Sequence, residues 1–581
     1  MPITEEPMPS PPSDIRILDR APAMKSPHRQ ATGRWDRRST GLLLGVLVLA
    51  TAAILHGIRV GEFSYNVDES QHAMTGLYIA DLVRDHPFTH PVEYTYRYYA
   101  QYPALSGIIH WPPLFYCVEG LVFLVLGPTV LAARLAILFF ALPGLVFWFL
   151  LVRELLNEWA AAFSAALLAL LPSVLLFEKT VMLEIPLLSC CIAASFFWVL
   201  YLLKGKKSDV YWFALFASAA LLTKQNGIYL IPFCALSGLL CGGWKLFLRK
   251  ELLRAMGICF LLISPFYAVV YAVHRKTIGM DLSENSIDGS SRWVFYLKAL
   301  PGQLGWSLLV LGILGILTSL MWGRPKVSGI MLSWIVACYL TLTLIGHKEG
   351  RYVIYWIPPF IYFASGLLFC FFRKPTLKVA GAAAAVLLVG TTMATAWSFR
   401  RPYVTGFAEV PKKILEESKS GVILFDGPLA GNFIFFMRAD DPARRFLVLR
   451  KALYAYQIKK SGGSMELIHS PQEIEDLFRH DGVRFIVVSD RAPLNFESQR
   501  MLRDVLKTPS FKELGRFPLG GDDLYPPNSS LVLYENLKWA PPAGKYLRIK
   551  MLTMDHDIVV PFSQFDLDED RPLQPQSPEE K

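Results

Sequence analysis

The chain has 581 residues, of which 53% are hydrophobic and 18% charged, and its mean hydropathy is +0.36. A soluble chain usually carries about 25% charged residues, so this composition indicates a membrane protein and excludes disordered, collagen-like and small secreted proteins. The formal charge of +10 comes without basic runs that alternate with aromatic residues, which excludes nucleic acid as a partner. The basic residues are instead expected to orient the spans.

The first part of the chain predicts a tail, a span and a long outer loop. Residues 1–40 are rich in Pro, Ser and Arg, which is typical of a disordered cytoplasmic tail. The apolar run 41–58 lacks a small-residue cleavage site after it, which favours an uncleaved first span over a signal peptide. Residues 59–130 then form the first outer loop. Its apolar run 114–126 contains Glu119 and is too short to span, so we expect a helix at the membrane interface.

Apolar stretches of roughly 18 residues predict about eleven membrane-spanning helices in a domain over residues 41–400. The basic turns then fall mostly on the cytoplasmic side, as the positive-inside rule requires. Residues 211–243 are too short for two full spans and too long for one, so two short helices are expected to meet at Lys224. After 41–58, the predicted spans are 131–152, 159–177, 186–203, 208–223, 227–243, 255–273, 298–321, 327–345, 353–371 and 379–397.

An odd number of spans places the rest of the chain on the outer face. The runs 421–426 and 483–489 are of strand type, and Ser470-Pro-Gln-Glu is a capped helix start. We therefore expect an outer, periplasmic α/β domain over 401–550. An acidic, proline-rich tail is expected over 551–581. The fold class is thus a helical polytopic membrane protein with a C-terminal extracytoplasmic α/β domain.

Four carboxylates are candidates for chemistry on the outer side. Asp68 and Glu69 follow the first span, and adjacent carboxylates can orient a nucleophile, accept its proton or bind a divalent cation. Asp68 can equally cap the helix expected over 69–85. Glu178 and Glu184 bracket a short outer loop, where an unpaired acid is costly, although Glu184 also suits a helix N-terminus.

Basic residues on the same side indicate an anionic ligand. Lys224, between two short spans, can meet a lipid-linked phosphate, or it can simply extend its charged end to water. The outer turn with His347, Lys348 and Arg351 departs from the positive-inside rule. Other chemistry is not supported, because the sequence has no Walker A loop, Rossmann fingerprint, H-E-x-x-H or G-x-S-x-G. The eight cysteines lack metal-ligand spacing and are expected to be buried thiols.

Taken in order, these motifs resemble the GT-C superfamily of glycosyltransferases that use polyprenyl-phosphate sugars, in the branch of the protein O-mannosyltransferases and the bacterial aminoarabinose transferase. The resemblance covers roughly residues 41–400. It rests on the following series: Asp68-Glu69, His110-Trp111-Pro112-Pro113, Glu184-Ile-Pro186, Thr223-Lys224 with Gly227, and His347 with Arg351-Tyr352 and Pro358.

The resemblance implies transfer of a sugar, with inversion, from the lipid-linked donor to a lipid, glycan or protein acceptor on the periplasmic face. Asp68 would act as base, with Glu69 and Glu184 in support or binding a cation. The residues implied at the donor phosphate are Lys224, His347 and Arg351, and those implied to support the acceptor and its loop are His110, Trp111 and Glu178.

Some implications of the resemblance stay open. The aminoarabinose transferase has Glu-Lys-Pro where this chain has His110-Trp111-Pro112, so one phosphate-binding lysine is missing. A divalent cation remains a possible cofactor, with Asp68 and Glu69 as its candidate ligands. The chief alternative function is a membrane transporter or lipid flippase, which would carry ionisable residues inside its spans. A noncatalytic scaffold is a third. A bacterial inner membrane with a cytoplasmic N-terminus is the expected location.

Overall fold

The structure, a computed structural model, describes residues 36–567 with several gaps. The gaps are residues 88, 106–109, 284–290, 320, 322–323, 372–375, 451, 457–462, 522–527, 553 and 555. Most of the expected N-terminal tail and residues 568–581 of the expected C-terminal tail therefore lie outside the described residues.

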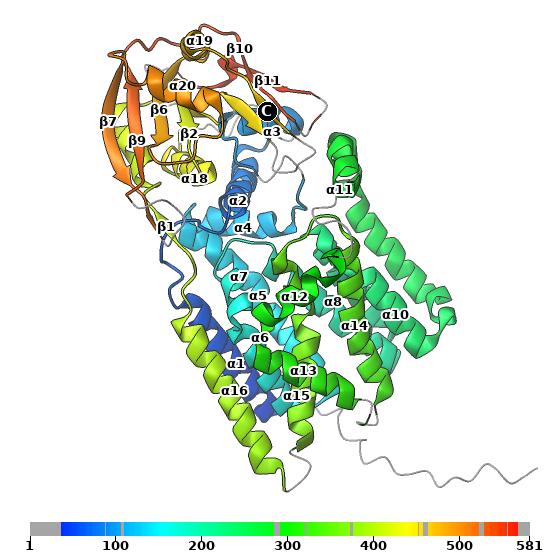
Figure 1. Cartoon of the computed structure of the whole chain (residues 1–581). Coiled ribbons are helices and arrows are strands. Elements are labelled where there is room, and N and C mark those ends of the chain that lie inside the picture. The colour runs from blue at the N-terminus through cyan, green and yellow to red at the C-terminus, as the bar shows by residue number, and fades with distance from the viewer. Residues whose placement is uncertain are drawn as a thin grey trace, which may run out of the picture.

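A bundle of apolar helices forms one part of the molecule (Figure 1). Within the described residues, 8 helical segments are long and apolar enough to cross a membrane, or 10 if each of two bent helix pairs is one span. α9 has only 15 residues and corresponds to the predicted span 208–223. The helices are α1 (Arg37–Leu55), α5 (Val130–Leu155), α6 (Glu158–Leu170), α7 (Pro172–Glu178), α8 (Glu184–Lys204), α9 (Lys207–Leu221), α10 (Leu230–Gly242), α11 (Lys250–Ser283), α12 (Ser291–Leu304), α13 (Trp306–Ser319), α14 (Pro325–Leu344), α15 (Ile357–Phe371) and α16 (Lys378–Ser398).

Two predicted spans are bent. The span expected over 159–177 is divided into α6 and α7 at an angle of 66°, because Pro172 has no N–H to continue the helix. The span expected over 298–321 is divided into α12 and α13, which meet at 116°. Gly305 joins them with a φ of +75°, a conformation that ends a right-handed helix.

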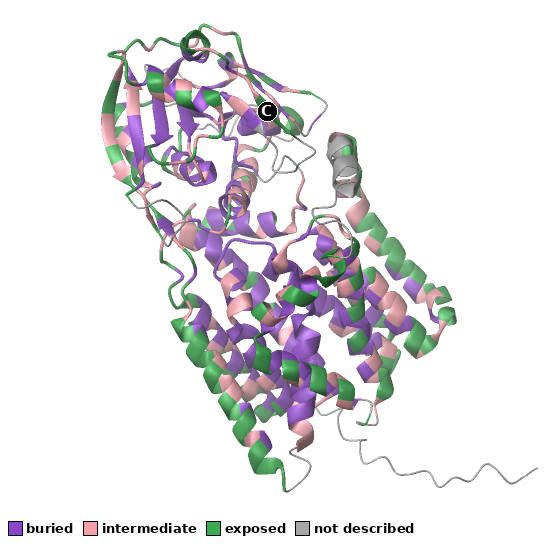
Figure 2. Cartoon of the chain, viewed as in Figure 1, coloured by how far each residue is buried: buried purple, intermediate pink, exposed green. Residues whose placement is uncertain are grey.

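Burial separates the centre of the bundle from its edge (Figure 2). In the segment 350–371, 89% of the span is buried, compared with 6% for the span of α11 and 17% for α16. The exposed side chains of α11 and α16 are largely apolar. These two helices therefore present the faces expected to contact lipid.

Three helices of the segment between α1 and α5 lie at one end of the bundle (Figure 1): α2 (Asp68–Asp85), α3 (Pro91–Gln101) and α4 (Leu114–Leu126). α4 has 13 residues, about 20 Å of helix, which is too short for the roughly 30 Å hydrocarbon core. It packs against α2 and α5. The expected short helix over 114–126 is present with those bounds.

The C-terminal domain is built on a five-stranded sheet of order β3-β2-β6-β9-β7. β2 (Gly421–Asp426), β3 (Phe446–Leu449) and β6 (Val483–Ser489) are parallel, whereas β9 (Ser530–Asn536) is antiparallel to both of its neighbours, β6 and β7 (Phe511–Pro518). The predicted strand runs 421–426 and 483–489 are β2 and β6, fully or almost fully buried. The domain's helices are α17 (Glu409–Glu417), α18 (Ala430–Asp440), α19 (Pro471–Asp481) and α20 (Glu497–Val505).

Three small strand pairs complete this domain, and one extends it beyond the expected boundary. β10 (Tyr546–Ile549) pairs with β11 (Ile558–Pro561), so the domain continues past residue 550, where the tail was expected to begin. The other pairs are β1 (Val404–Thr405) with β8 (Gly520–Gly521), and β4 (Tyr454–Tyr456) with β5 (Ser464–Glu466). The domain covers the end of the bundle that carries α2 and α4 (Figure 1).

Candidate active site

Asp68 lies at the first position of α2, where the chain enters the helix after Asn66 in a left-handed conformation. Its carboxylate Oδ2 accepts a hydrogen bond from Arg351 Nη2 at 3.1 Å. The Asp68 side chain is 30% exposed. It is therefore held by a cation and still accessible to a molecule arriving from outside.

Glu69, its neighbour, has the opposite environment. It is fully buried, and its carboxylate accepts the backbone N–H groups of Ser64 at 2.8 Å, Tyr65 at 2.9 Å and Val181 at 3.2 Å. Arg134 Nε lies 3.8 Å from the same carboxylate. Because these oxygens are already occupied, Asp68 and Glu69 do not form a ligand pair for a divalent cation. Among the described residues, no three His, Cys, Asp or Glu side chains are grouped to hold a metal.

Glu184, Lys224 and Arg351 meet in the interior beside Asp68. Lys224 Nζ donates to Glu184 Oε1 at 2.6 Å, and Arg351 Nε lies 3.4 Å from the same oxygen. Glu184 is fully buried, and the two cationic side chains are 3% and 8% exposed. We call Asp68, Glu184, Lys224 and Arg351 the charge cluster. Two carboxylates there face two cations in a region that excludes most water, where charge–charge interactions are strengthened.

The turns between spans position these side chains. Glu184 begins α8, and Lys224 lies between the end of α9 and the 3₁₀ helix η1 (Gln225–Tyr229), which confirms the two short helices predicted to meet there. Arg351 belongs to another 3₁₀ helix, η4 (Gly350–Trp356), which precedes α15. Each charge is thus fixed where a helix begins or is interrupted.

Aromatic rings line the charge cluster. Lys224 Nζ lies 5.4 Å from the centre of the Trp111 ring and 5.2 Å from that of Tyr352. The Arg351 guanidinium lies 6.0 Å from the ring of Tyr65 and 5.9 Å from that of Tyr352. Such cation–π contacts stabilise a desolvated cation. Trp111 therefore has a specific place in the site.

His72 was not predicted from the sequence as a site residue. It follows Asp68 by four residues, however, and so lies on the same face of α2. Its Nδ1 is 2.7 Å from the Tyr116 hydroxyl, and its ring meets Trp111 edge-on. Burial lowers the pKa of His72 to about 4, so the ring is neutral near pH 7. Desolvation raises the pKa of Tyr65 to about 12, which keeps its hydroxyl protonated. Neither group adds net charge to the cluster.

His347 lies at the rim of the site. Its Nε2 is 3.1 Å from Glu349 Oε1, and Glu349 lies 3.8 Å from Arg351. The hydrogen bond from His347, more than the attraction of Arg351, lowers the pKa of Glu349. His347 is 49% exposed, so it reaches the charge cluster through Glu349 and not by direct contact.

Lys348 turns away from the site. Its Nζ donates to the carbonyl oxygens of Leu342 and Thr343, at 3.1 and 2.6 Å, and to that of Ile345. These carbonyls belong to the C-terminal end of α14, where a cation is favourable. The basic turn thus contains one lysine with a structural role beside an arginine in the charge cluster.

The remaining predicted site residues, His110 and Glu178, do not belong to the charge cluster. The carbonyl oxygen of His110 accepts a hydrogen bond from Gln225 Nε2 at 3.0 Å, which fixes the segment before Trp111 against the Lys224 turn. Glu178 is buried at the end of α7. The hydrogen bonds and ion pairs of the described residues do not join Glu178 to the charge cluster.

Comparison with known proteins gives one family match and several structural matches. Residues 110–268 match the profile of the dolichyl-phosphate-mannose-protein mannosyltransferase family. No curated protein sequence matches the chain significantly. The crystal structure of ArnT from Cupriavidus metallidurans in the apo state superimposes with a TM-score of 0.59 and 14% identity, covering 87% of this chain and 100% of that one. The chain has the GT-C glycosyltransferase fold.

Two further structures extend this fold comparison. ArnT from Cupriavidus metallidurans bound to undecaprenyl phosphate has a TM-score of 0.57 and 12% identity, covering 85% of this chain and 98% of that one. The apo oligosaccharyltransferase of Archaeoglobus fulgidus has a TM-score of 0.53 and 12% identity, covering 84% and 75% respectively. The predicted GT-C fold is confirmed.

The family match also bears on activity. It covers α4 to α10 and part of α11, and it includes Glu184 and Lys224 of the charge cluster together with Trp111 beside them. A mannosyltransferase profile in this position confirms the prediction of a membrane glycosyltransferase, and it does not favour a transporter. Asp68 and Arg351 lie outside the matched segment and join the cluster only through the fold.

Proposed function

We propose that this chain transfers a sugar from a polyprenyl-phosphate donor to a lipid, glycan or protein acceptor, with inversion at the anomeric carbon. The observation that carries the proposal is the charge cluster itself. Asp68, partly exposed, and the buried pair Glu184–Lys224 are joined by one residue, Arg351. The structure of similar fold that was solved with undecaprenyl phosphate supports a lipid phosphate as the carrier that the sugar leaves.

On the donor side, Lys224 and Arg351 would bind the phosphate. Glu184 holds both cations within hydrogen-bonding or ion-pair distance, which positions them together for the phosphate. The aromatic rings of Trp111 and Tyr352 exclude water from Lys224. As the bond from the anomeric carbon to the phosphate oxygen breaks, negative charge grows on the phosphate, and the two cations stabilise it.

On the acceptor side, Asp68 would act as the general base. The acceptor oxygen or nitrogen attacks the anomeric carbon opposite the leaving phosphate, and its proton passes to Asp68. One bond forms as the other breaks, so the configuration inverts. His347, Glu349 and His110 would shape the entrance and the Trp111 segment without taking part in proton transfer.

Glu69 would be a positioning residue. Its carboxylate joins Ser64 and Tyr65, which precede Asp68, to Val181 in the loop before Glu184. It therefore sets the spacing between the two halves of the charge cluster. Since Glu69 does not fit as a metal ligand, the proposed mechanism has no step that involves a divalent cation.

The proposed setting is a bacterial inner membrane with a cytoplasmic N-terminus. α2, which begins at Asp68, lies at the same end of the bundle as the C-terminal domain (Figure 1), which supports one shared, periplasmic side for both. The lipid-linked donor and the acceptor would then both be bound at that face.

The test is a transfer assay with purified protein in detergent. Radiolabelled polyprenyl-phosphate sugars and host membrane extract are incubated with the wild type, with Asp68→Ala, and with the surface control Asp504→Ala. Transfer by the wild type and the control, but not by Asp68→Ala, is the expected result. Folded wild-type protein that turns over no donor would contradict the proposed function.

A further inference from the structure

The C-terminal domain contacts α2, the helix that carries Asp68, near both ends of the helix. α18 follows strand β2 in the chain and packs against α2 (Figure 1). The two helices belong to segments more than 300 residues apart in the sequence. The contact therefore connects the proposed active site to a domain that supplies no residue of the charge cluster.

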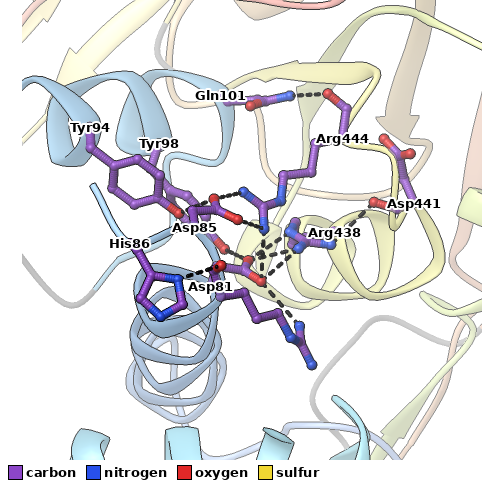
Figure 3. Close-up of polar contacts among 10 residues, drawn as sticks. Asp81, Asp85, His86, Tyr94, Tyr98, Gln101, Arg438, Asp441 and Arg444 are labelled. Atoms are coloured by element: carbon purple, nitrogen blue, oxygen red, sulfur yellow. Dashed lines mark hydrogen bonds and ion pairs between the residues drawn. The ribbon is translucent and has the colours of Figure 1, made fainter. Parts of the chain in front are cut away.

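At the far end of α2, buried ion pairs fix the helix to the C-terminal domain (Figure 3). Arg438 donates to both oxygens of Asp81, from Nε at 2.9 Å and from Nη2 at 2.8 Å. Arg444 lies 3.1 Å from Asp81 and also pairs with Asp85. Asp81 is fully buried and Arg438 is 5% exposed. A bidentate pair of this kind restricts geometry more than a single contact does.

At the near end, the contact is with the segment around Asp68 itself. Asn432 Nδ2 donates to the carbonyl oxygen of Phe63 at 2.7 Å, and Asn432 is fully buried. Gly431 lies directly against Ser70, two residues after Asp68. A Cβ atom at position 431 would lie 2.2 Å from Ser70 Oγ and 3.0 Å from Ser70 Cβ. A side chain at position 431 would therefore force Ser70 to move.

We propose that α18 positions the candidate base, with Gly431 and Asn432 as positioning residues that act through the first turn of α2. The inference rests on the function proposed above. From Asp68 to Asp81 the helix rises about 20 Å as one rigid unit. Because its far end is fixed to the same domain, a displacement at Ser70 changes where Asp68 lies relative to Arg351 and Glu184. A misplacement of 1 Å can reduce turnover about 100-fold.

The first test is Gly431→Ala, with Gly515→Ala as the matched control. In the control, a Cβ would lie 3.4 Å from the Phe517 side chain, an ordinary contact within the same domain. Gly431→Ala should lower kcat for transfer at least about tenfold through displacement of Asp68. The affinity for undecaprenyl phosphate should not change, since Lys224 and Arg351 keep Glu184 as partner. The control should behave like the wild type in both measurements.

A second measurement does not depend on turnover. The N–H groups of Ser64 and Tyr65 are bonded to Glu69 in the first turn of α2. Hydrogen exchange followed by mass spectrometry should show faster exchange of the peptide around residues 62–72 in Gly431→Ala but not in Gly515→Ala. Adding Ser70→Ala to Gly431→Ala removes the closest colliding atom and should restore part of kcat. Asn432→Ala, which introduces no collision, should lower kcat in the same direction.

Three outcomes would overturn the positioning role. The first is a wild-type kcat in both Gly431→Ala and Asn432→Ala. The second is an unchanged rate of hydrogen exchange over residues 62–72 in Gly431→Ala. The third is a fall of the affinity for undecaprenyl phosphate in Gly431→Ala that parallels the fall of kcat. A wild-type protein without any transfer would contradict the proposed function instead. In that case hydrogen exchange would still test the positioning role. Faster exchange over residues 62–72 in Gly431→Ala would support it, and unchanged exchange would overturn it.

Discussion

The adjacent carboxylates Asp68 and Glu69 show how neighbours in sequence take different roles. Successive residues of a helix point about 100° apart, so only one of them can face the charge cluster. Asp68 meets Arg351 and remains partly exposed, whereas Glu69 is buried among backbone N–H groups. The sequence motif alone suggests a pair, but the fold separates the two side chains.

Replacement of Glu69 by Gln tests its positioning role. The amide must turn its NH₂ toward at least one of the donors that the carboxylate now accepts, so we expect a loss of about 1–3 kcal/mol in the free energy of unfolding. Transfer activity should fall as well, and added Mg²⁺ or Mn²⁺ should not restore it. Thermal unfolding and the transfer assay measure both effects. Glu154→Gln, in the partly exposed pair with Lys204, is the control; recovery of activity by a metal would contradict this account.

Lys348 provides a second residue-scale test. In Lys348→Met the C-terminal carbonyls of α14 lose their cation, which should reduce stability by about 1 kcal/mol. The affinity for undecaprenyl phosphate should change by less than about twofold, equivalent to a few tenths of a kcal/mol. A larger loss of affinity in a binding titration would show that Lys348 contacts the phosphate.

Element positions were predicted well where hydropathy determines them. The short helices that meet at Lys224 and the short helix over 114–126 follow from apolar run lengths and from the residues that interrupt them. The bend between α12 and α13 was missed, because Gly305 lies in an apolar stretch and hydropathy does not report backbone conformation. The Asp81–Arg438 pair was also missed, since a contact across 357 residues leaves no local pattern.

The bend at Gly305 gives an element-scale prediction. An added Cβ at this glycine would meet nothing within 4 Å, so only its φ of +75° opposes a side chain. Gly305→Ala should therefore reduce stability by about 1–2 kcal/mol, the strain of a left-handed conformation in a residue with a Cβ. Gly302→Ala lies within α12, is equally uncrowded, and should stabilise by up to about 1 kcal/mol. Equal unfolding temperatures in detergent for the two variants would contradict the assigned bend.

On the scale of the whole molecule, the segment between α1 and α5 holds the bundle and the C-terminal domain together. Besides the Asp81 ion pairs, Glu62 accepts the N–H groups of Gly406, Phe407 and Ala408, which come directly before α17. Ser64 Oγ donates to the carbonyl oxygen of Pro402. The segment that leads into Asp68 is thus bonded directly to the chain where it enters the C-terminal domain.

Asp81→Asn tests how strongly the two parts depend on each other. It leaves the buried guanidinium of Arg438 without its counter-ion, so we expect a loss of about 3–5 kcal/mol in stability. The control Asp504→Asn breaks an exposed pair with Lys507 and should change stability by less than about 1 kcal/mol. Unfolding curves in detergent compare the two; a small effect at Asp81 would mean that the domains are joined by other contacts.

The central claim is that the charge cluster divides the reaction between an acceptor base and a donor phosphate site. The most direct measurement determines undecaprenyl phosphate affinity and sugar transfer together in Asp68→Asn and Lys224→Gln. Asp68→Asn should keep the affinity and lose at least about 100-fold in transfer. Lys224→Gln should lose both, because a charge-assisted contact to the phosphate disappears. Wild-type transfer by Asp68→Asn, or wild-type affinity in Lys224→Gln, would contradict this division of roles.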